Sequence, residues 1–150
     1  MRIHEVGIVI GGIPIIYKTY DEDINVNHNS DIICKSALMS SILNFAEIIL
    51  SPMESFESNR YNVFFKKNKI NSNNSQNLDF FAYVVSDKEK KSEKLKKNIN
   101  TVLEKIIDEF KSQYNGDDYT EVSHYSKFNN VIDKILGQGN STEDKFESIF

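Results

Sequence analysis

The chain has 150 residues, 39% of them hydrophobic, and it carries a formal net charge of −4 with an isoelectric point near 5.4. This length and hydrophobic content predict one folded domain with a core of its own. The acidic balance argues against nucleic acid as the main partner, because phosphate binding needs a concentrated basic surface and the sequence shows none.

The N-terminal sequence has neither the basic region nor the apolar run of a signal peptide, and no run of about 18 uninterrupted apolar residues is present to span a bilayer. The single cysteine, Cys34, has no partner for an internal disulfide, which fits a reducing compartment. We therefore expect a cytoplasmic protein with no integral membrane segment, which reaches membranes, if at all, through its partners.

The chain begins with a predicted β-hairpin. Two β-rich runs, Val6 to Ile10 and Ile13 to Tyr20, meet at Gly11-Gly12. A Gly-Gly pair adopts the positive φ angles of a primed two-residue turn. Pro14 removes a backbone donor near the start of the second run, where a strand tolerates this loss best.

A long helix is predicted from Ile32 to Leu50. The polar residues 21–31 before it predict a loop that ends in Ser30 and Asp31 as N-caps, and Pro52 marks the helix end. The polar residues of the helix gather on one narrow stripe, so the apolar arc is about twice the roughly 100° that a helix on a core needs. We therefore expect something besides its own sheet to cover this helix.

One assignment of the helix faces places five apolar residues against the sheet: Cys34, Leu38, Ile42, Phe45 and Ile49. A second apolar stripe then forms a partner interface, of the kind that marks protein contacts: Ile32, Met39, Leu43 and Leu50. The reverse assignment of inner and outer face stays open. Coverage by the chain's own residues 138–150 or by its long loops stays open as well.

Three strands are predicted next, over Met53 to Glu57, Arg60 to Lys67 and Leu78 to Val85, with a polar loop from Asn68 to Asn77. The last run is almost continuously apolar, which predicts a central strand covered on both faces.

Two helices are predicted after the strands. Ser86 and Glu89 fit a capping box that opens a helix from about Asp87 to Tyr114, and Asn115-Gly116 ends it. Ser123 is the predicted cap of a shorter helix that ends at Gly137. The expected fold class is α+β, with the order ββαβββαα and a five-stranded antiparallel sheet with one helix on one face and two on the other. Residues 1–136 form the expected domain and residues 137–150 a flexible C-terminal tail.

Glycine and acidic motifs offer no convincing ligand site. Gly7, Gly11 and Gly12 lead into a strand instead of a helix, and no Gly-Lys-Ser/Thr follows, which argues against a phosphate-binding loop. Asp21, Asp23 and Asn25 resemble the opening of a calcium-binding loop. Val26 and Ile32 stand where such a loop needs glycine and glutamate, so a solvated acidic turn is the better interpretation.

Nucleophiles and metal ligands are equally scattered. His4, His28 and His124 have no metal-ligand spacing, and Cys34 lies on the apolar helix, where a thiol usually acts as a small hydrophobe. Ser40-Ser41 lacks the Gly-x-Ser-x-Gly elbow of a serine hydrolase. We therefore expect that the protein is not an enzyme and that it binds neither a cofactor nor a metal ion.

The run from Lys88 to Lys97 is interleaved with Glu89 and Glu93, which indicates a solvated helix face in place of a membrane-binding patch. Arg2 and Arg60 are the only arginines. If the protein supplies an arginine finger, it has to be one of these two residues. Whether Arg60 contributes to nucleotide hydrolysis in a partner stays open.

Four segments in this order carry a family resemblance: Gly12 to Tyr17, Lys35 to Phe45, Tyr61 to Phe65 and Leu78 to Val85. Over about residues 3–136 the chain resembles longin domains, which have a profilin-like fold. The related roadblock proteins share the architecture but begin with a helix, so longin is the better match in the longin/roadblock superfamily.

The resemblance implies a non-enzymatic adaptor of vesicle-trafficking assemblies. Such domains pair with another longin or roadblock subunit, as a homo- or heterodimer, and bind or regulate a small GTPase. The chain departs from the SNARE type of longin protein because no heptad region follows residue 136. Whether pairing uses the first helix or a sheet edge stays open. The alternative function is a small-molecule-binding sensory domain, because a sheet with helices on both faces can enclose a ligand.

Overall fold

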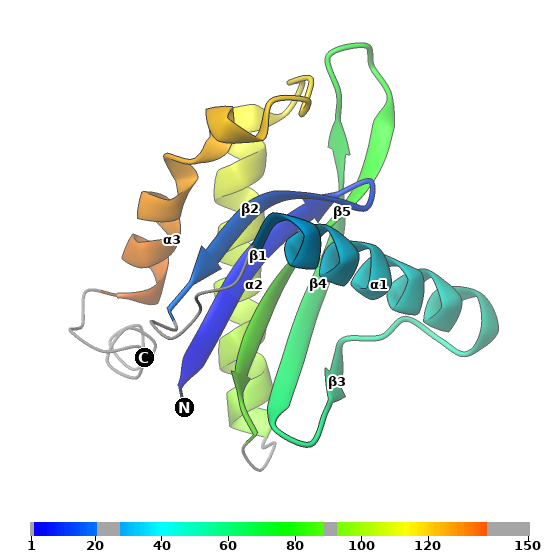
Figure 1. The fold of residues 1–150 in the computed structure, drawn as a ribbon, viewed down its shortest axis with the longest axis vertical. Coiled ribbons are helices and arrows are strands. Elements are labelled where there is room, and N and C mark those ends of the chain that lie inside the picture. Colours follow the sequence, from blue (N-terminus) through cyan, green and yellow to red (C-terminus); the bar gives the residue numbers. More distant parts are fainter. Residues whose placement is uncertain (1, 21–27, 89–92, 138–150) are drawn as a thin grey trace.

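The computed structural model describes residues 2–20, 28–88 and 93–137 (Figure 1). It confirms the expected fold class, an α+β fold of order ββαβββαα with a five-stranded antiparallel sheet and three α-helices. The elements are β1 (Ile3–Ile10), β2 (Ile13–Thr19), α1 (His28–Ile49), β3 (Ser55–Glu57), β4 (Tyr61–Asn71), β5 (Asn77–Asp87), α2 (Glu93–Tyr114), the 3-10 helix η1 (Val122–Tyr125) and α3 (Phe128–Leu136).

The strands lie in the order β2-β1-β5-β4-β3, and every neighbouring pair is antiparallel. Gly11 and Gly12 join β1 to β2 with φ angles of 56° and 83°, so the predicted hairpin is confirmed. β5 lies between β1 and β4, and its residues Phe80 to Val84 are all buried. The prediction of a central strand covered on both faces is therefore confirmed.

One face of the sheet carries α2 and α3 and holds the larger core. The buried residues of α2 keep the helical spacing of a single apolar stripe: Ile99, Val102, Leu103, Ile106, Ile107 and Phe110. Phe128, Ile132 and Leu136 add the buried side of α3. These residues pack on inward-facing strand residues such as Ile8 and Ala82.

Of the helices in the described part of the chain, α1 is the one that lies on the opposite face of the sheet (Figure 1). Met39 and Leu43 pack there on Val9, Phe81 and Tyr83, in a smaller cluster. Successive residues of β1 thus pack in different cores, since Ile8 faces α2 and α3 while Val9 faces α1. The expected division into one helix and two helices is confirmed.

α1 begins earlier than predicted. It starts at His28, so Ser30 and Asp31 lie within the helix and are not its N-caps. Aspartate is favoured in the first turn of a helix as well as at its N-cap, so its presence alone does not place the boundary. Residues 21–27, which include the acidic motif, lie outside the described residues.

The polar loop predicted from Asn68 to Asn77 is half strand, and the connection itself is limited to residues 72–76. β4 continues to Asn71, which pairs with Asn77, and Lys69 forms an ion pair with its cross-strand partner Asp79. Ile70 between them is buried in the larger core. Cross-strand pairing and one buried side chain therefore extend this hairpin through a polar sequence.

The predicted capping box is wrong. β5 runs through Ser86, which is fully buried and pairs with Asn62 of β4, and α2 begins only at Glu93. Glu89 lies outside the described residues. The prediction of Ser123 as a helix cap is also wrong, because this residue lies inside η1 and α3 begins at Phe128. The helix ends at Asn115-Gly116 and at Gly137 are confirmed.

Gly7 makes room for the largest buried side chain on the α1 face. It lies in β1 opposite Tyr83 of β5, and the Tyr83 ring crosses directly over it. A Cβ atom on residue 7 would stand 2.5 Å from ring atom Cε1 of Tyr83. With glycine there, the Tyr83 hydroxyl reaches along the strand and donates to Glu5 at 2.6 Å.

We expect Gly7→Ala to destabilise the domain by about 2 kcal/mol, in the range of overpacked core substitutions. Urea unfolding of the wild type, Gly7→Ala, Tyr83→Ala and the double variant measures this effect. In the Tyr83→Ala background the added methyl group meets no ring, so the cost of Gly7→Ala should vanish there. An equal cost in both backgrounds would show that the Tyr83 ring is not the cause.

Candidate interaction surface

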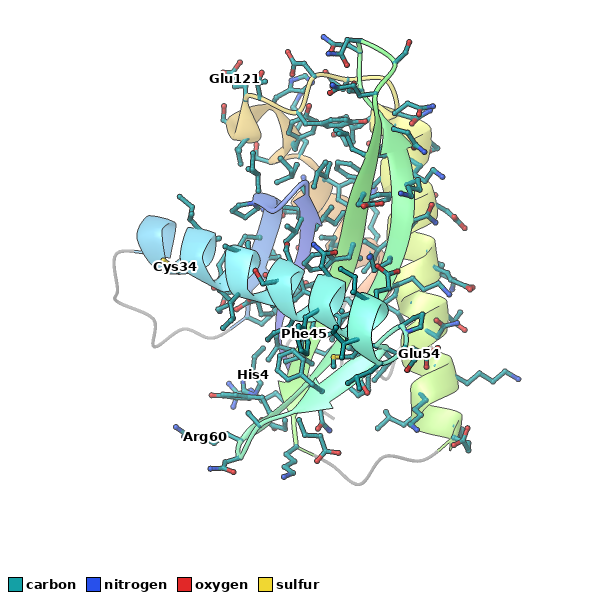
Figure 2. All side chains as sticks on the ribbon, turned by 90° about the vertical axis from the view of Figure 1, so that its right-hand side faces the viewer. His4, Cys34, Phe45, Glu54, Arg60 and Glu121 are labelled. Carbon is teal, nitrogen blue, oxygen red and sulfur yellow. The ribbon has the colours of Figure 1, made fainter. Side chains whose placement is uncertain are left out.

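α1 turns most of its large apolar side chains away from the sheet. Figure 2 shows the helix with Cys34 near its start and Phe45 nearer its end. We call five residues, each more than half exposed, the outer face of α1: Ile33, Leu38, Phe45, Ile48 and Ile49.

The outer face is large for a protein that acts alone. Five such side chains, each more than half exposed, present on the order of 500 Å² of apolar surface, in the upper part of the range for the largest patch on a typical monomer. A standard protein interface buries about 800 Å² on each partner. The outer face and its surroundings therefore provide most of one side of such an interface.

For most residues of α1, the side of the helix on which they lie is the reverse of the one predicted from the sequence. Met39 and Leu43 were predicted to meet a partner, and both are buried against the sheet, so that prediction is wrong for these two residues. Leu50 is exposed and Ile32 is half-buried. Of the residues predicted to face the sheet, Ile42 is half-buried, and four are exposed: Cys34, Leu38, Phe45 and Ile49.

The buried stripe of α1 runs through Ser36, Met39, Leu43 and Ala46. Its spacing is helical, and its small residues let the helix approach a sheet face crowded by Phe81 and Tyr83. The sequence holds two apolar stripes of similar strength, so periodicity alone does not select between them.

A buried carboxylate selects the face. Glu5 projects from β1 under α1, with its side chain only 8% exposed. It accepts hydrogen bonds from the hydroxyls of Tyr83 at 2.6 Å and Tyr17 at 3.1 Å, and it pairs with Lys35 of α1 at 2.8 Å. The Lys35 ammonium also lies 5.7 Å from the centre of the Tyr17 ring. A buried charge needs such partners, so α1 must turn Lys35 toward the sheet.

A second ion pair holds the other end of the helix. Glu47 lies 2.5 Å from Lys67 of β4. Lys35 and Glu47 are the only charged residues between Ile32 and Leu50, and both are directed at the sheet. The outer face therefore carries no charge of its own. Sequence reasoning missed Glu5, although a lone carboxylate inside an apolar strand is a usable signal for a buried polar network.

Both edges of the sheet carry features that discourage pairing with another strand. β3 at one edge has three residues. β2 at the other edge contains Pro14, and its pairing shifts at Ile8 and Val9 so that Ile15 is an extra residue, as in a β-bulge. Lys18 of β2 pairs with Asp133 of α3 at 3.1 Å. Short strands, proline, bulges and lysine are the devices that blunt sheet edges.

The residues considered for chemistry do not converge. His4 contacts Asp87 and Tyr61, whereas His124 lies 3.5 Å from Asp117 in a different part of the fold. Within residues 2–20, 28–88 and 93–137, no group of three or more His, Cys, Asp or Glu side chains could hold a metal ion.

The remaining candidates lie at the surface or in helix contacts. Arg60 is exposed in the turn between β3 and β4 (Figure 2). The Ser41 hydroxyl donates to the carbonyl of Ala37 in its own helix. In the described part of the lysine run, Lys88 lies 3.6 Å from Glu57, and Lys94, Lys96 and Lys97 are exposed.

A groove of about 470 Å³ follows the β2 edge and is mainly apolar. We call it the β2 groove. The start of α1 forms one wall with Ile32 and Ile33, and η1 with the start of α3 forms the other with Val122 and Ser126. Ile33 belongs to this groove and to the outer face of α1, so the two apolar surfaces are continuous.

Two smaller grooves are more polar. One of about 400 Å³ lies between α2 and the β3–β4 region, and one of about 300 Å³ lies under α1 beside Gly11 and Gly12.

The 18-residue window Ile32–Ile49 of α1 is long and apolar enough to cross a membrane by length and composition alone. Core helices of soluble proteins pass the same test, but only 22% of this window is buried in the fold. Two charged residues, Lys35 and Glu47, interrupt the apolar run. α1 thus exposes more apolar surface than a helix buried in a core does.

Comparison with known proteins identifies no family: no family model matches the chain, and no curated protein matches it significantly.

We expect Glu5→Ala to destabilise the domain by about 3 kcal/mol, because it leaves the Tyr83 hydroxyl buried without an acceptor and removes the anchor of α1. Lys35→Met should cost less, about 1 kcal/mol, because the tyrosine hydroxyls still satisfy Glu5 and residue 35 is partly exposed. Urea unfolding compares the two variants. A larger loss for Lys35→Met would contradict the central role of the carboxylate.

Stability should fall at alkaline pH. Burial raises the pKa of Tyr125 to about 12, and burial, together with the nearby Glu5 carboxylate, raises the pKa of Tyr83. Unfolded tyrosine titrates near pH 10, so above that value the unfolded state loses protons that the folded state keeps. Each buried tyrosine should then lower the free energy of unfolding by up to about 1.4 kcal/mol per pH unit.

The test is to measure the free energy of unfolding of the wild type and of Tyr83→Phe at several pH values above 10 and to compare how steeply it falls with pH. Tyr83→Phe removes one titrating group, so its stability should fall less steeply with pH. Parallel curves for the two proteins would contradict the contribution of Tyr83.

Proposed function

We propose that the chain is a non-enzymatic interaction module of the longin type, which pairs through the outer face of α1 with another longin-like or roadblock-like subunit. The observation that carries this proposal is the uncharged apolar outer face. Its exposure to water is unfavourable by roughly 25 cal/mol for each Å² that a partner could cover. The element order and the position of α1 alone on one face agree with the resemblance to longin domains.

The outer face suits a partner helix. Ile33, Ala37, Ser41 and Phe45 follow one another at intervals of four residues, so they form one row along the helix. The two small residues, Ala37 and Ser41, lie between the two large ones, and both are exposed. Small residues between large ones form a depression into which the side chains of a second helix pack. A second copy presents the same surface, so a twofold dimer places both depressions against matching ridges.

Competing modes of association are less favourable. The two sheet edges are blunted, so pairing through a strand has little exposed backbone to use. A helix that lies in a membrane surface usually carries lysine or arginine on its polar side. α1 offers only Lys35 between Ile32 and Leu50, and Glu5 already binds it.

The proposed partners also include a small GTPase, which the pair would bind or regulate. This part follows from the resemblance, and it implies a cytoplasmic protein that meets membranes through its partners. Arg2 and Arg60 are both exposed, and Arg60 in the β3–β4 turn is an arginine that can contact such a partner.

A small-molecule-binding domain is the second candidate function. The β2 groove favours it, because its volume of about 470 Å³ and its mainly apolar walls are in the range of ligand sites. Such a ligand would be apolar. Stabilisation of the protein by an apolar ligand, with loss of the effect in a groove variant, would support this alternative.

We expect Ile48→Asp to abolish pairing. Residue 48 is 81% exposed in the single chain, so the variant should fold normally, whereas an aspartate buried in the interface should cost about 2–4 kcal/mol, or roughly 30- to 700-fold in the dissociation constant. Light scattering across a concentration series measures the oligomeric state, and binding of GTP- and GDP-loaded small GTPases is measured on the same samples.

Val122→Asp is the matched control, since it places the same charge at an exposed apolar residue away from the outer face, and it should still pair. Unchanged oligomeric state and unchanged GTPase binding in Ile48→Asp would refute the role of the outer face. Binding of the wild type to lipid vesicles in place of a second subunit would assign this surface to a membrane.

A further inference from the structure

We propose that Phe146, Ile149 and Phe150 of this same chain bind in the β2 groove. The groove is a built part of the fold, since it lies between α1 on one face of the sheet and η1 with α3 on the other. Its exposed apolar side chains include Ile13, Ile33 and Val122. An intramolecular segment would remove these side chains from water.

The sequence of residues 138–150 matches this groove. The segment is polar except for Phe146, Ile149 and Phe150, whose spacing of three and four residues would place them on one side if the segment bound as a helical turn. Three large apolar side chains on one side are what an apolar groove accommodates. The segment therefore has one surface that gains by burial and one that stays in water.

The chain is long enough to reach. α3 is nine residues long, so its axis spans about 14 Å, and Asn129 near its start lines the groove. The nine residues from Gly137 to Phe146 span up to about 30 Å when extended, about twice the length of α3. Because the segment is tethered, its effective concentration at the groove is in the millimolar range, which favours it over a free ligand of similar chemistry.

Docking would also complete the protection of the β2 edge. Pro14 and the bulge at Ile15 blunt the start of this strand, and covering an edge with a chain segment is another device that proteins use. Docking would cover Ile33, which the groove shares with the outer face of α1. It would therefore compete with pairing, a consequence that rests on the proposed function.

The single cysteine allows a direct test in the full chain. Cys34 is exposed and follows Ile33, so a nitroxide attached to it reports on the groove. The label is placed in the Ile48→Asp variant, where pairing through the outer face is blocked, so the result does not depend on the proposed function. We expect the label to cause loss of the amide resonance intensities of residues 146–150.

Three variants and one mixture complete the experiment. Val122→Asp in the groove wall and the double variant Phe146→Ser, Phe150→Ser should each restore these intensities, whereas Leu38→Asp, an exposed apolar residue outside the groove, should leave the loss unchanged. Isotope-labelled protein mixed with spin-labelled, isotope-free protein should show no loss. Three results would each overturn the proposal. They are full intensities in the spin-labelled Ile48→Asp protein, an unchanged loss of intensity in Val122→Asp, and a loss in the mixture, which would show that the segment of a second copy binds.

Discussion

The hydrogen-bonded carboxylate of Glu5 is the constraint on which the arrangement of α1 depends. It is buried on the face of the sheet that α1 covers, where it accepts hydrogen bonds from two tyrosine hydroxyls and pairs with one lysine. A charge in such a place is tolerated only when its partners are held in position. Lys35 comes from the helix, so the ion pair fixes the rotation of α1. Gly7 belongs to the same unit, because it clears the path that Tyr83 takes to Glu5.

The two layers of the molecule contribute differently. α2, α3 and the strand residues facing them form a large aromatic and aliphatic core around Phe110, Tyr125 and Phe128. The α1 layer has a smaller apolar cluster, a polar network beneath the helix and an apolar outer face. The larger core thus lies on one side of the sheet, and the exposed apolar face of α1 lies on the other.

The sequence predicted the fold class because its periodicities are strong. The Gly11-Gly12 turn, the apolar run of β5 and the single stripe of α2 each allow one interpretation. The rotation of α1 was not predictable, because Met39 with Leu43 and Leu38 with Phe45 are equally apolar stripes. The selection comes from Glu5, whose partners lie 12, 30 and 78 residues away in the chain. Ser86 was misjudged for a similar reason, since its strand partner Asn62 is distant in sequence.

The blunted edges of the sheet have a consequence for assembly size. Open β-sheet edges allow growth without limit, because every added strand exposes a new edge. Here β3 is short and β2 is interrupted by Pro14 and a bulge, so neither end of the sheet can act as a template. A single helix face that a second copy covers by twofold symmetry leaves no equivalent face exposed for a further copy. The architecture therefore favours assemblies that stop at a defined number of subunits over filaments.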